Sequence, residues 1–131
     1  MIIDSSAIVA IIQGEPEAER FKALIGHAER RCLSAASYLE IGIAVDRWRD
    51  HGLSRRVDEF IHAAGLTIEP LTEAQARIAR EAYRDYGRGS GHPAGLNFGD
   101  CCAYALARDK NEPLLFKGDD FGHTDIRSAL A

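Results

Sequence analysis

Five acidic side chains follow or interrupt short apolar stretches, and acids placed in this way can bind divalent cations. They are Asp4, Glu40, Asp100 and the adjacent pair Asp119 and Asp120. Carboxylates within a few ångströms of one another raise each other's pKa unless a cation neutralises them. Mg²⁺ and Mn²⁺ prefer oxygen ligands, and such ions turn bound water into a nucleophile for phosphoester hydrolysis. The acids therefore predict metal-dependent phosphoester chemistry, provided that the fold brings them together.

Each acid also has an ordinary structural explanation. Asp4 precedes two serines and is a suitable helix cap, and Asp100 fits the first turn of a helix through the helix dipole. Glu40 taken alone is typical of a solvated helix residue, whereas Asp119 and Asp120 suit a turn after a glycine. No single acid identifies a site, so the hypothesis depends on their joint placement.

The hydrophobic pattern predicts short strands that alternate with helices. Strands are expected at 2–4, 31–34, 66–70 and 114–117, with a short edge strand near 125–126, and helices at 6–14, 21–28, 37–48, 53–64, 72–86 and 97–111. Ser5 or Ser6 is expected to cap the first helix, Ser37 to cap the third, and Gly52 to mark a break. This alternation indicates an α/β fold with a mostly parallel central sheet.

The predicted topology gives the acids a common location. Ligands of open parallel sheets bind beyond the carboxyl ends of the strands. Asp4 ends the first predicted strand, and Asp119 and Asp120 follow the last long one. Asp100 lies in the first turn of a helix whose N-terminus is expected at the same edge.

Composition restricts the class of protein. The 131 residues, 46% hydrophobic and 27% charged, predict one globular domain spanning 1–131. No apolar run approaches the roughly 20 residues of a membrane helix, and the start lacks a basic leader. Three cysteines make a poor disulfide framework, which favours reduced thiols and a cytoplasmic location. A net charge of −4 excludes a generally basic nucleic-acid binder, so a polyanionic ligand would need local cations.

Other reaction classes lack their motifs. The five histidines show no zinc-ligand spacing. Neither a dinucleotide-binding Gly-x-Gly-x-x-Gly, nor a P-loop, nor a serine-centred elbow is present.

Four stretches of the chain resemble the PIN domain family, in particular its VapC-type toxins from toxin–antitoxin pairs. They are Ile-Ile-Asp-Ser-Ser-Ala (2–7), Ala-Ala-Ser-Tyr-Leu-Glu-Ile (35–41), Leu-Asn-Phe-Gly-Asp-Cys (96–101) and Leu-Leu-Phe-Lys-Gly-Asp-Asp-Phe (114–121). The resemblance implies a three-layer α/β/α sandwich and an endoribonuclease that uses Mg²⁺ or Mn²⁺, commonly on tRNA or rRNA. It also implies a homodimer, a cognate VapB-type antitoxin that blocks the site, and a toxin–antitoxin hetero-oligomer.

Individual roles follow from the same resemblance. Asp4, Glu40 and Asp100 match the first three acids of the family, Ser6 the small hydroxyl residue near the metal, and Asn97 the polar residue before the third acid. Asp4 and Asp100 are then expected to bind the main ion. Glu40 and the fourth acid would hold a second ion or orient the attacking water.

The fourth acid has two candidates. Alignment on Asp-Phe selects Asp120, which makes it the expected fourth metal ligand. Many relatives carry a further acid two residues earlier, where this chain has Gly118. Asp119 is the neighbouring residue that could take over its role, so both aspartates remain candidates.

Candidate RNA-contacting groups are the cations nearest the acids. Arg84 and Arg88 end an arginine-rich run that leads into the Gly-rich loop before Asn97, and Lys117 lies beside the last acids. Such side chains contact phosphates and release counterions. Solvated helix faces are the alternative explanation for most of the arginines.

Two further functions compete with the nuclease. One is a metal-dependent phosphatase acting on small phosphoesters, although the opening Asp-Ser-Ser lacks the second acid of an aspartyl-phosphate enzyme. The other is a non-catalytic binding module with a PIN-like fold, against which the complete acid set argues.

Overall fold

A four-stranded parallel sheet forms the centre of the molecule in the computed structural model, which describes residues 1–131. The strand order is β3-β2-β1-β4, and every pairing is parallel. The strands are β1 (Ile2–Ile3), β2 (Cys32–Ser34), β3 (Thr67–Glu69) and β4 (Leu114–Leu115). The predicted α/β class with a parallel sheet is confirmed.

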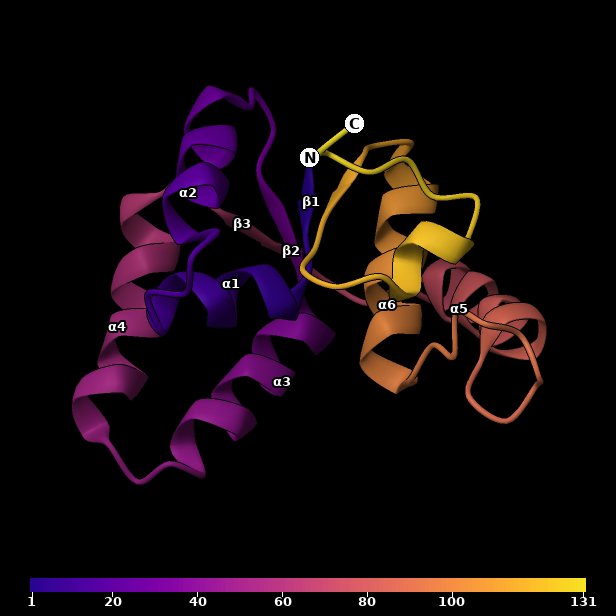
Figure 1. Ribbon diagram of the computed structural model, residues 1–131, viewed down its shortest axis with the longest axis horizontal. Coiled ribbons are helices and arrows are strands. Elements are labelled where there is room, and N and C mark those ends of the chain that lie inside the picture. The colour runs from indigo at the N-terminus through magenta and orange to yellow at the C-terminus, as the bar shows by residue number, and fades with distance from the viewer.

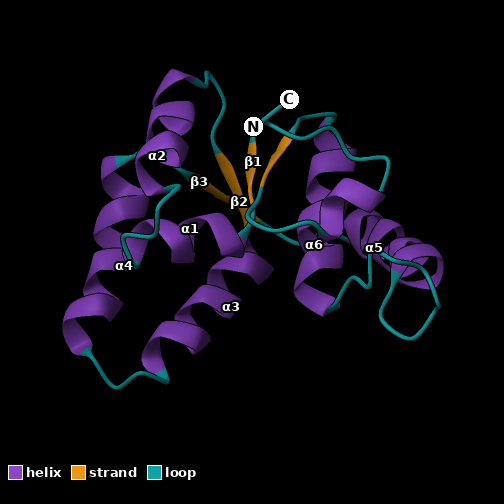
Figure 2. Cartoon of the chain, viewed as in Figure 1, coloured by secondary structure: helices purple, strands orange, loops and turns teal.

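Helices cover both faces of the sheet and produce three layers (Figure 1). Figure 2 shows α1 to α4 on one side and α5, α6 and the C-terminal segment on the other. The helices are α1 (Ser5–Ile12), α2 (Ala18–His27), α3 (Ala35–Asp46), α4 (His51–Ala63), α5 (Glu73–Tyr86) and α6 (Phe98–Lys110), with a 3₁₀ helix η1 (Asp120–His123). None of these helices combines the length and the apolar character that crossing a membrane requires.

Strands β1 and β4 are apolar at every position because both of their faces are buried. Ile3 and Leu115 point into a core shared with α1 to α4, whereas Ile2 and Leu114 point into a second core shared with α5 and α6. All four side chains are fully buried. Two separate cores therefore clamp the sheet and fix the position of its strand ends.

The chain passes from two strands into helices without an intervening loop. Asp4 follows β1 and is the N-cap of α1, its backbone N–H donating to the Leu115 carbonyl (2.9 Å). Ser34 ends β2 and is the N-cap of α3. Asp4 and the start of α3 are therefore held at the same edge of the sheet.

Three predicted helix starts were wrong. The predicted cap at Ser5 or Ser6 is Asp4, and α3 is capped by Ser34 instead of Ser37, which is fully buried. Asp50 caps α4, so that Gly52 lies inside its first turn. In each case an earlier side-chain oxygen already satisfies the first free N–H groups of the helix.

The end of the chain also differs from its prediction. No strand forms at 125–126, and only an isolated parallel bridge joins Leu114 and Ser128. By contrast, the predicted Asn97 cap of α6 is present.

Candidate active site

Asp4 lies at the carboxyl end of the central strand β1 and exposes only 2% of its surface. Its Oδ2 accepts hydrogen bonds from the backbone N–H (3.0 Å) and the hydroxyl (2.6 Å) of Ser6. Burial raises the pKa of Asp4 to about 7, the two Ser6 bonds oppose this rise, and the charges of Asp100 and Glu40 add to it. Oδ1 is buried and has no hydrogen-bond partner.

Ser6 connects this carboxylate to the neighbouring strand. Its hydroxyl donates to Asp4 and accepts the backbone N–H of Lys117 at 3.0 Å. Ser6, which the family resemblance places near the metal, therefore joins the ends of β1 and β4, two strands far apart in the chain.

Glu40 reaches the site from α3. The hydroxyl of Ser5 donates to its Oε1 at 2.6 Å. The rest of the carboxylate lies against Gly99 of α6, where any added Cβ would overlap it. Glu40 is half-buried, so it is not the fully solvated helix residue of the alternative explanation.

Asp100 enters from the first turn of α6 through a reciprocal capping arrangement. The Asn97 backbone N–H donates to Oδ2 of Asp100 (3.0 Å), and the Asp100 N–H donates to Oδ1 of Asn97 (2.8 Å). Burial raises the pKa of Asp100, the Asn97 bond lowers it, and the charges of Asp120 and Glu40 raise it. Arg88 contributes a smaller lowering effect.

The first three acids are held in the same way. Oδ2 of Asp4, Oε1 of Glu40 and Oδ2 of Asp100 each accept a hydrogen bond from the chain. One oxygen of each carboxylate therefore orients the side chain, while the other is left for a ligand. Ser6 and Asn97 lie two and three positions from the acids that they orient, whereas Ser5 orients Glu40 from a position next to Asp4.

Asp120 and Asp119 occupy different environments. Asp120 begins η1 and its charge acts on Asp100. Asp119 precedes η1, is exposed, and makes no side-chain capping bond. The structure therefore brings Asp120 into the cluster of Asp4, Glu40 and Asp100, and the choice of Asp120 as fourth ligand stays a prediction.

The donor set fits a hard divalent cation. All donors are carboxylate oxygens, and Asp4 has a buried oxygen without a hydrogen-bond partner. No three His, Cys, Asp or Glu side chains form a complete set of ligands by themselves. Mg²⁺ needs no such set, because it usually keeps several waters and takes one or two carboxylates.

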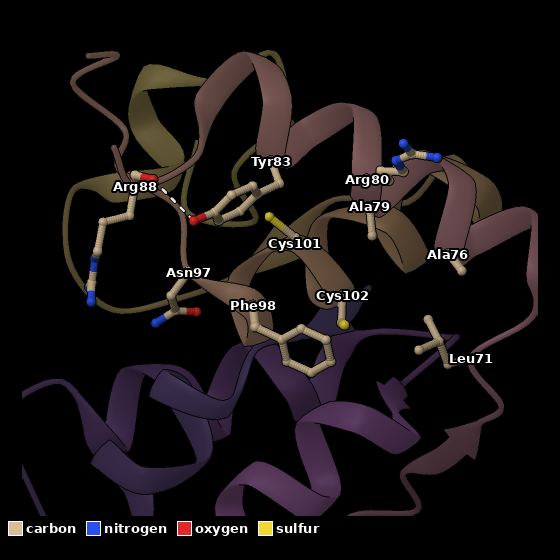
Figure 3. A pocket seen from close by; sticks show the side chains of 10 residues that line it. All are labelled: Leu71, Ala76, Ala79, Arg80, Tyr83, Arg88, Asn97, Phe98, Cys101 and Cys102. Carbon is tan, nitrogen blue, oxygen red and sulfur yellow. Dashed lines mark hydrogen bonds between the residues drawn. The ribbon is translucent and has the colours of Figure 1, made fainter. Parts of the chain in front are cut away.

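The three predicted RNA-contacting residues differ in how their charge is engaged. Arg84 pairs with Asp85 (3.0 Å). The ammonium group of Lys117 contacts Glu15 and lies 3.0 Å from Glu17. Arg88 makes no ion pair and lies next to Asn97 (Figure 3).

Two site residues were missed from the sequence. Ser5 had a recognisable signal, because it directly follows Asp4 in a polar pair. Gly99 had none, since its contact with Glu40 depends on how α3 and α6 pack.

Comparison with known proteins agrees with this geometry. The family model described as PIN domain matches residues 1–127. Ribonuclease VapC28 of Mycobacterium tuberculosis is 58% identical over 130 residues, which cover 99% of this chain and 98% of that protein. Ribonuclease VapC42 of the same species is 50% identical over 129 residues, 98% of both chains.

The chain belongs to the PIN domain family. Within that family, its similarity is to the VapC ribonucleases, which confirms the predicted resemblance and the predicted enzyme class, a nuclease.

Solved structures share the fold at low sequence identity. The crystal structure of VapC20 from Mycobacterium tuberculosis has a TM-score of 0.73 at 16% identity, covering 95% of each chain. FitAcB from Neisseria gonorrhoeae has a TM-score of 0.68 at 20% identity, covering 98% of this chain and 96% of that one. These neighbours confirm the predicted α/β/α sandwich.

Replacing Asp4 by Asn is expected to stabilise the metal-free protein at alkaline pH. The pKa of Asp4 is about 7 in the folded state, against 3.8 for an unperturbed aspartate. Because the folded state binds its proton more tightly, stability falls as pH rises from about 4 to about 7. Asn avoids this loss, which is on the order of 4 kcal/mol at pH 8, and it still caps α1.

Thermal unfolding in EDTA at pH 4 and pH 8 measures this difference, with Asp46→Asn, an exposed residue of α3, as control. Adding Mg²⁺ at pH 8 should stabilise the parent chain and leave Asp4→Asn unchanged. Equal stability of parent and Asp4→Asn in EDTA at pH 8 would contradict the argument.

Gly99→Ala is expected to impair nuclease activity without loss of stability. The added Cβ displaces the Glu40 carboxylate, and misplacement by about 1 Å can cost about 100-fold in rate, whereas Ala favours the helix. Gly42→Ala, two residues after Glu40 with no atom near the added Cβ, is the matched control. Urea unfolding and rate measurements on both variants check this, and full activity of Gly99→Ala refutes it.

Proposed function

We propose that this chain is a Mg²⁺- or Mn²⁺-dependent endoribonuclease, the toxin of a toxin–antitoxin pair, which hydrolyses phosphodiester bonds of tRNA or rRNA. The observation that carries the proposal is the buried Asp4 carboxylate with a free oxygen, surrounded by Glu40, Asp100 and Asp120. The names of the close relatives, all VapC ribonucleases, support RNA as the substrate.

Asp4 and Asp100 are the residues that would hold the main cation, each through the oxygen that the chain leaves unused. When bound, a divalent cation neutralises the acids and activates water at neutral pH. Asp120, exposed at the start of η1, is the residue that would complete the ligand set.

Glu40 is the group that would orient and deprotonate the attacking water. Ser5 and Gly99 hold its carboxylate in one position, which suits in-line attack. The water oxygen bonds to phosphorus as its proton passes to Glu40, and the bond from phosphorus to the ribose oxygen breaks. The leaving oxygen then takes up a proton.

The partners proposed for this chain follow from its family. VapC20 is described as a toxin that cleaves the sarcin–ricin loop, and another structural neighbour is a toxin–antitoxin complex from Klebsiella pneumoniae. We propose a cognate VapB-type antitoxin that blocks the acid cluster in a hetero-oligomer. The three free thiols and this role favour the cytoplasm.

A homodimer is proposed through the outer face of α3. Leu39 and Ile43 expose 63% and 53% of their surface, while Ile41 and Val45 on the inner face are fully buried. A helix that is apolar on both faces needs a second cover. A second copy of this chain provides one, since an isologous contact pairs the same apolar patch with itself.

Nuclease assays with Mg²⁺ or Mn²⁺ test the proposed activity. Asp4→Asn, Asp100→Asn and Asp120→Asn should each lower RNA cleavage by about 100-fold or more, whereas Asp119→Asn should retain most of it. EDTA should abolish cleavage by the parent chain. Cleavage that persists in EDTA refutes metal dependence, and hydrolysis of small phosphoesters without RNA cleavage would favour the phosphatase alternative. Parent protein that binds RNA without cleaving it would favour the non-catalytic module.

Ile43→Glu should convert the dimer into monomers, because it places two charges in the apolar contact. Light scattering on the parent chain, on Ile43→Glu and on the control Ala74→Glu of α5 measures the mass. A monomeric parent, or a dimer that survives Ile43→Glu, disproves this interface.

A further inference from the structure

A cavity of about 560 Å³ lies between α5 and the start of α6, outside the acid cluster. Its volume lies in the range of small-molecule sites. Its walls are mostly apolar, with cysteine thiols in the wall from α6 and arginines at its edges (Figure 3). The lining residues include Ala76, Arg80, Tyr83, Arg88, Asn97 and Phe98.

Asn97 connects the wall of this cavity with the acid cluster. Asn97 lines the cavity and also makes the reciprocal hydrogen bonds with Asp100. A strand of RNA with a phosphate at the acids would therefore pass directly over the cavity. The nucleotide adjacent to that phosphate is the group best placed to enter it.

Arg88 is prepared to contact a phosphate at the mouth of the cavity. Its backbone N–H donates to the Leu96 carbonyl (2.9 Å), and its carbonyl accepts the Tyr83 hydroxyl (3.1 Å) (Figure 3). These bonds fix the backbone, while the guanidinium makes no ion pair with the chain. A guanidinium can bind phosphate oxygens in a bidentate manner.

Two exposed aromatic side chains line the same cavity as Arg88. Phe98 exposes 75% of its surface and Tyr83 48%, and both line the cavity. An exposed ring next to a cation is the usual composition of a single-strand binding surface, because every base presents a face for stacking. Phe98 also lines a smaller hollow with Glu40, Leu39 and Ile43, so it lies between the acid cluster and the apolar face of α3.

The charges of the cavity favour RNA over a second copy of this chain. Arg80 and Arg88 line the cavity, and no carboxylate does. Glu81 lies with Arg77 and Arg84 around an adjoining hollow, where Arg77 pairs with Glu73 and Arg84 with Asp85. In a two-fold contact centred here, the arginines of one copy would face the same arginines of the other. A polyanion with apolar bases matches both the charge and the walls.

We propose that this cavity is a nucleotide-binding subsite, in which Arg88 contacts a backbone phosphate and Phe98 with Tyr83 accepts an unpaired base of the substrate RNA. The inference rests on the proposed ribonuclease function and adds the position at which the strand next to the cleaved bond is held.

Binding of two probes separates the phosphate from the base. The probes are a fluorescein-labelled single-stranded RNA of mixed sequence and an abasic oligomer of the same length, titrated in Mg²⁺ into the full chain carrying Asp4→Asn to prevent cleavage. Phe98→Ala should weaken binding of the RNA about tenfold and leave binding of the abasic oligomer unchanged. Arg88→Ala should weaken binding of both probes. It should also reduce the slope of the logarithm of the binding constant against the logarithm of salt concentration by about one.

Arg20→Ala, an exposed arginine of α2 without an ion pair, is the matched control for charge and should change both probes by less than about twofold, because its charge lies outside the subsite. Ala76→Leu narrows the cavity, so it should weaken binding of the RNA and leave binding of the abasic oligomer unchanged. Ala74→Leu on the same helix should change neither. Thermal unfolding confirms that each variant is folded.

Several results would overturn the subsite. The subsite is disproved if Arg88→Ala and Phe98→Ala bind RNA as tightly as the parent chain. It is also disproved if Phe98→Ala weakens binding of the RNA and of the abasic oligomer equally. Loss of the dimer in Phe98→Ala with unchanged RNA binding would instead assign the cavity to a second copy. The chain with Asp4 intact is assayed for Mg²⁺-dependent RNA cleavage in parallel. If it cleaves while the variants bind normally, the subsite alone fails; if it neither binds nor cleaves RNA, the proposed function fails as well.

Discussion

Burial of the Asp4 carboxylate at the end of the central strand is the constraint on which the rest of the structure depends. An ionised carboxylate loses hydration there, and Ser6 replaces only part of it, because Oδ1 has no partner. Folding alone would favour the neutral acid, as its raised pKa shows. The chain retains a destabilising group at the centre of its sheet, which is the expected cost of a site prepared for a cation.

The surrounding fold serves to fix the other acids relative to Asp4. Parallel pairing brings the ends of β1, β2 and β4 to one edge, and α1 and α3 begin there without a loop. Serines and an asparagine then use one oxygen of each acid, which fixes orientation and leaves the other oxygen available. The contact of Glu40 with Gly99 depends on how α3 packs against α6, so no single segment of the chain could fix this carboxylate.

The sequence was sufficient to predict the fold class and the positions of the four main strands, because these depend on local apolar patterns. The family motif selected the acids, whose roles stay predictions. The sequence also predicted the Asn97 cap, whose hydrogen-bonding side chain lies next to the helix that it caps. It could not decide whether Asp4 was a helix cap or a site residue. In the structure, one carboxylate oxygen caps α1 and the other is buried without a partner, so capping does not use the whole group. The choice between Asp119 and Asp120 depends on the turn of η1, and Gly99 on tertiary packing, neither of which periodicity encodes.

Anomalous scattering from crystals soaked in Mn²⁺ tests the central claim most directly, because it locates the ion without relying on activity. We predict a peak within bonding distance of Oδ1 of Asp4 and of the unused oxygen of Asp100, and loss of that peak in Asp4→Asn crystals. An empty acid cluster under the same soak, or a peak that remains in Asp4→Asn, would contradict it.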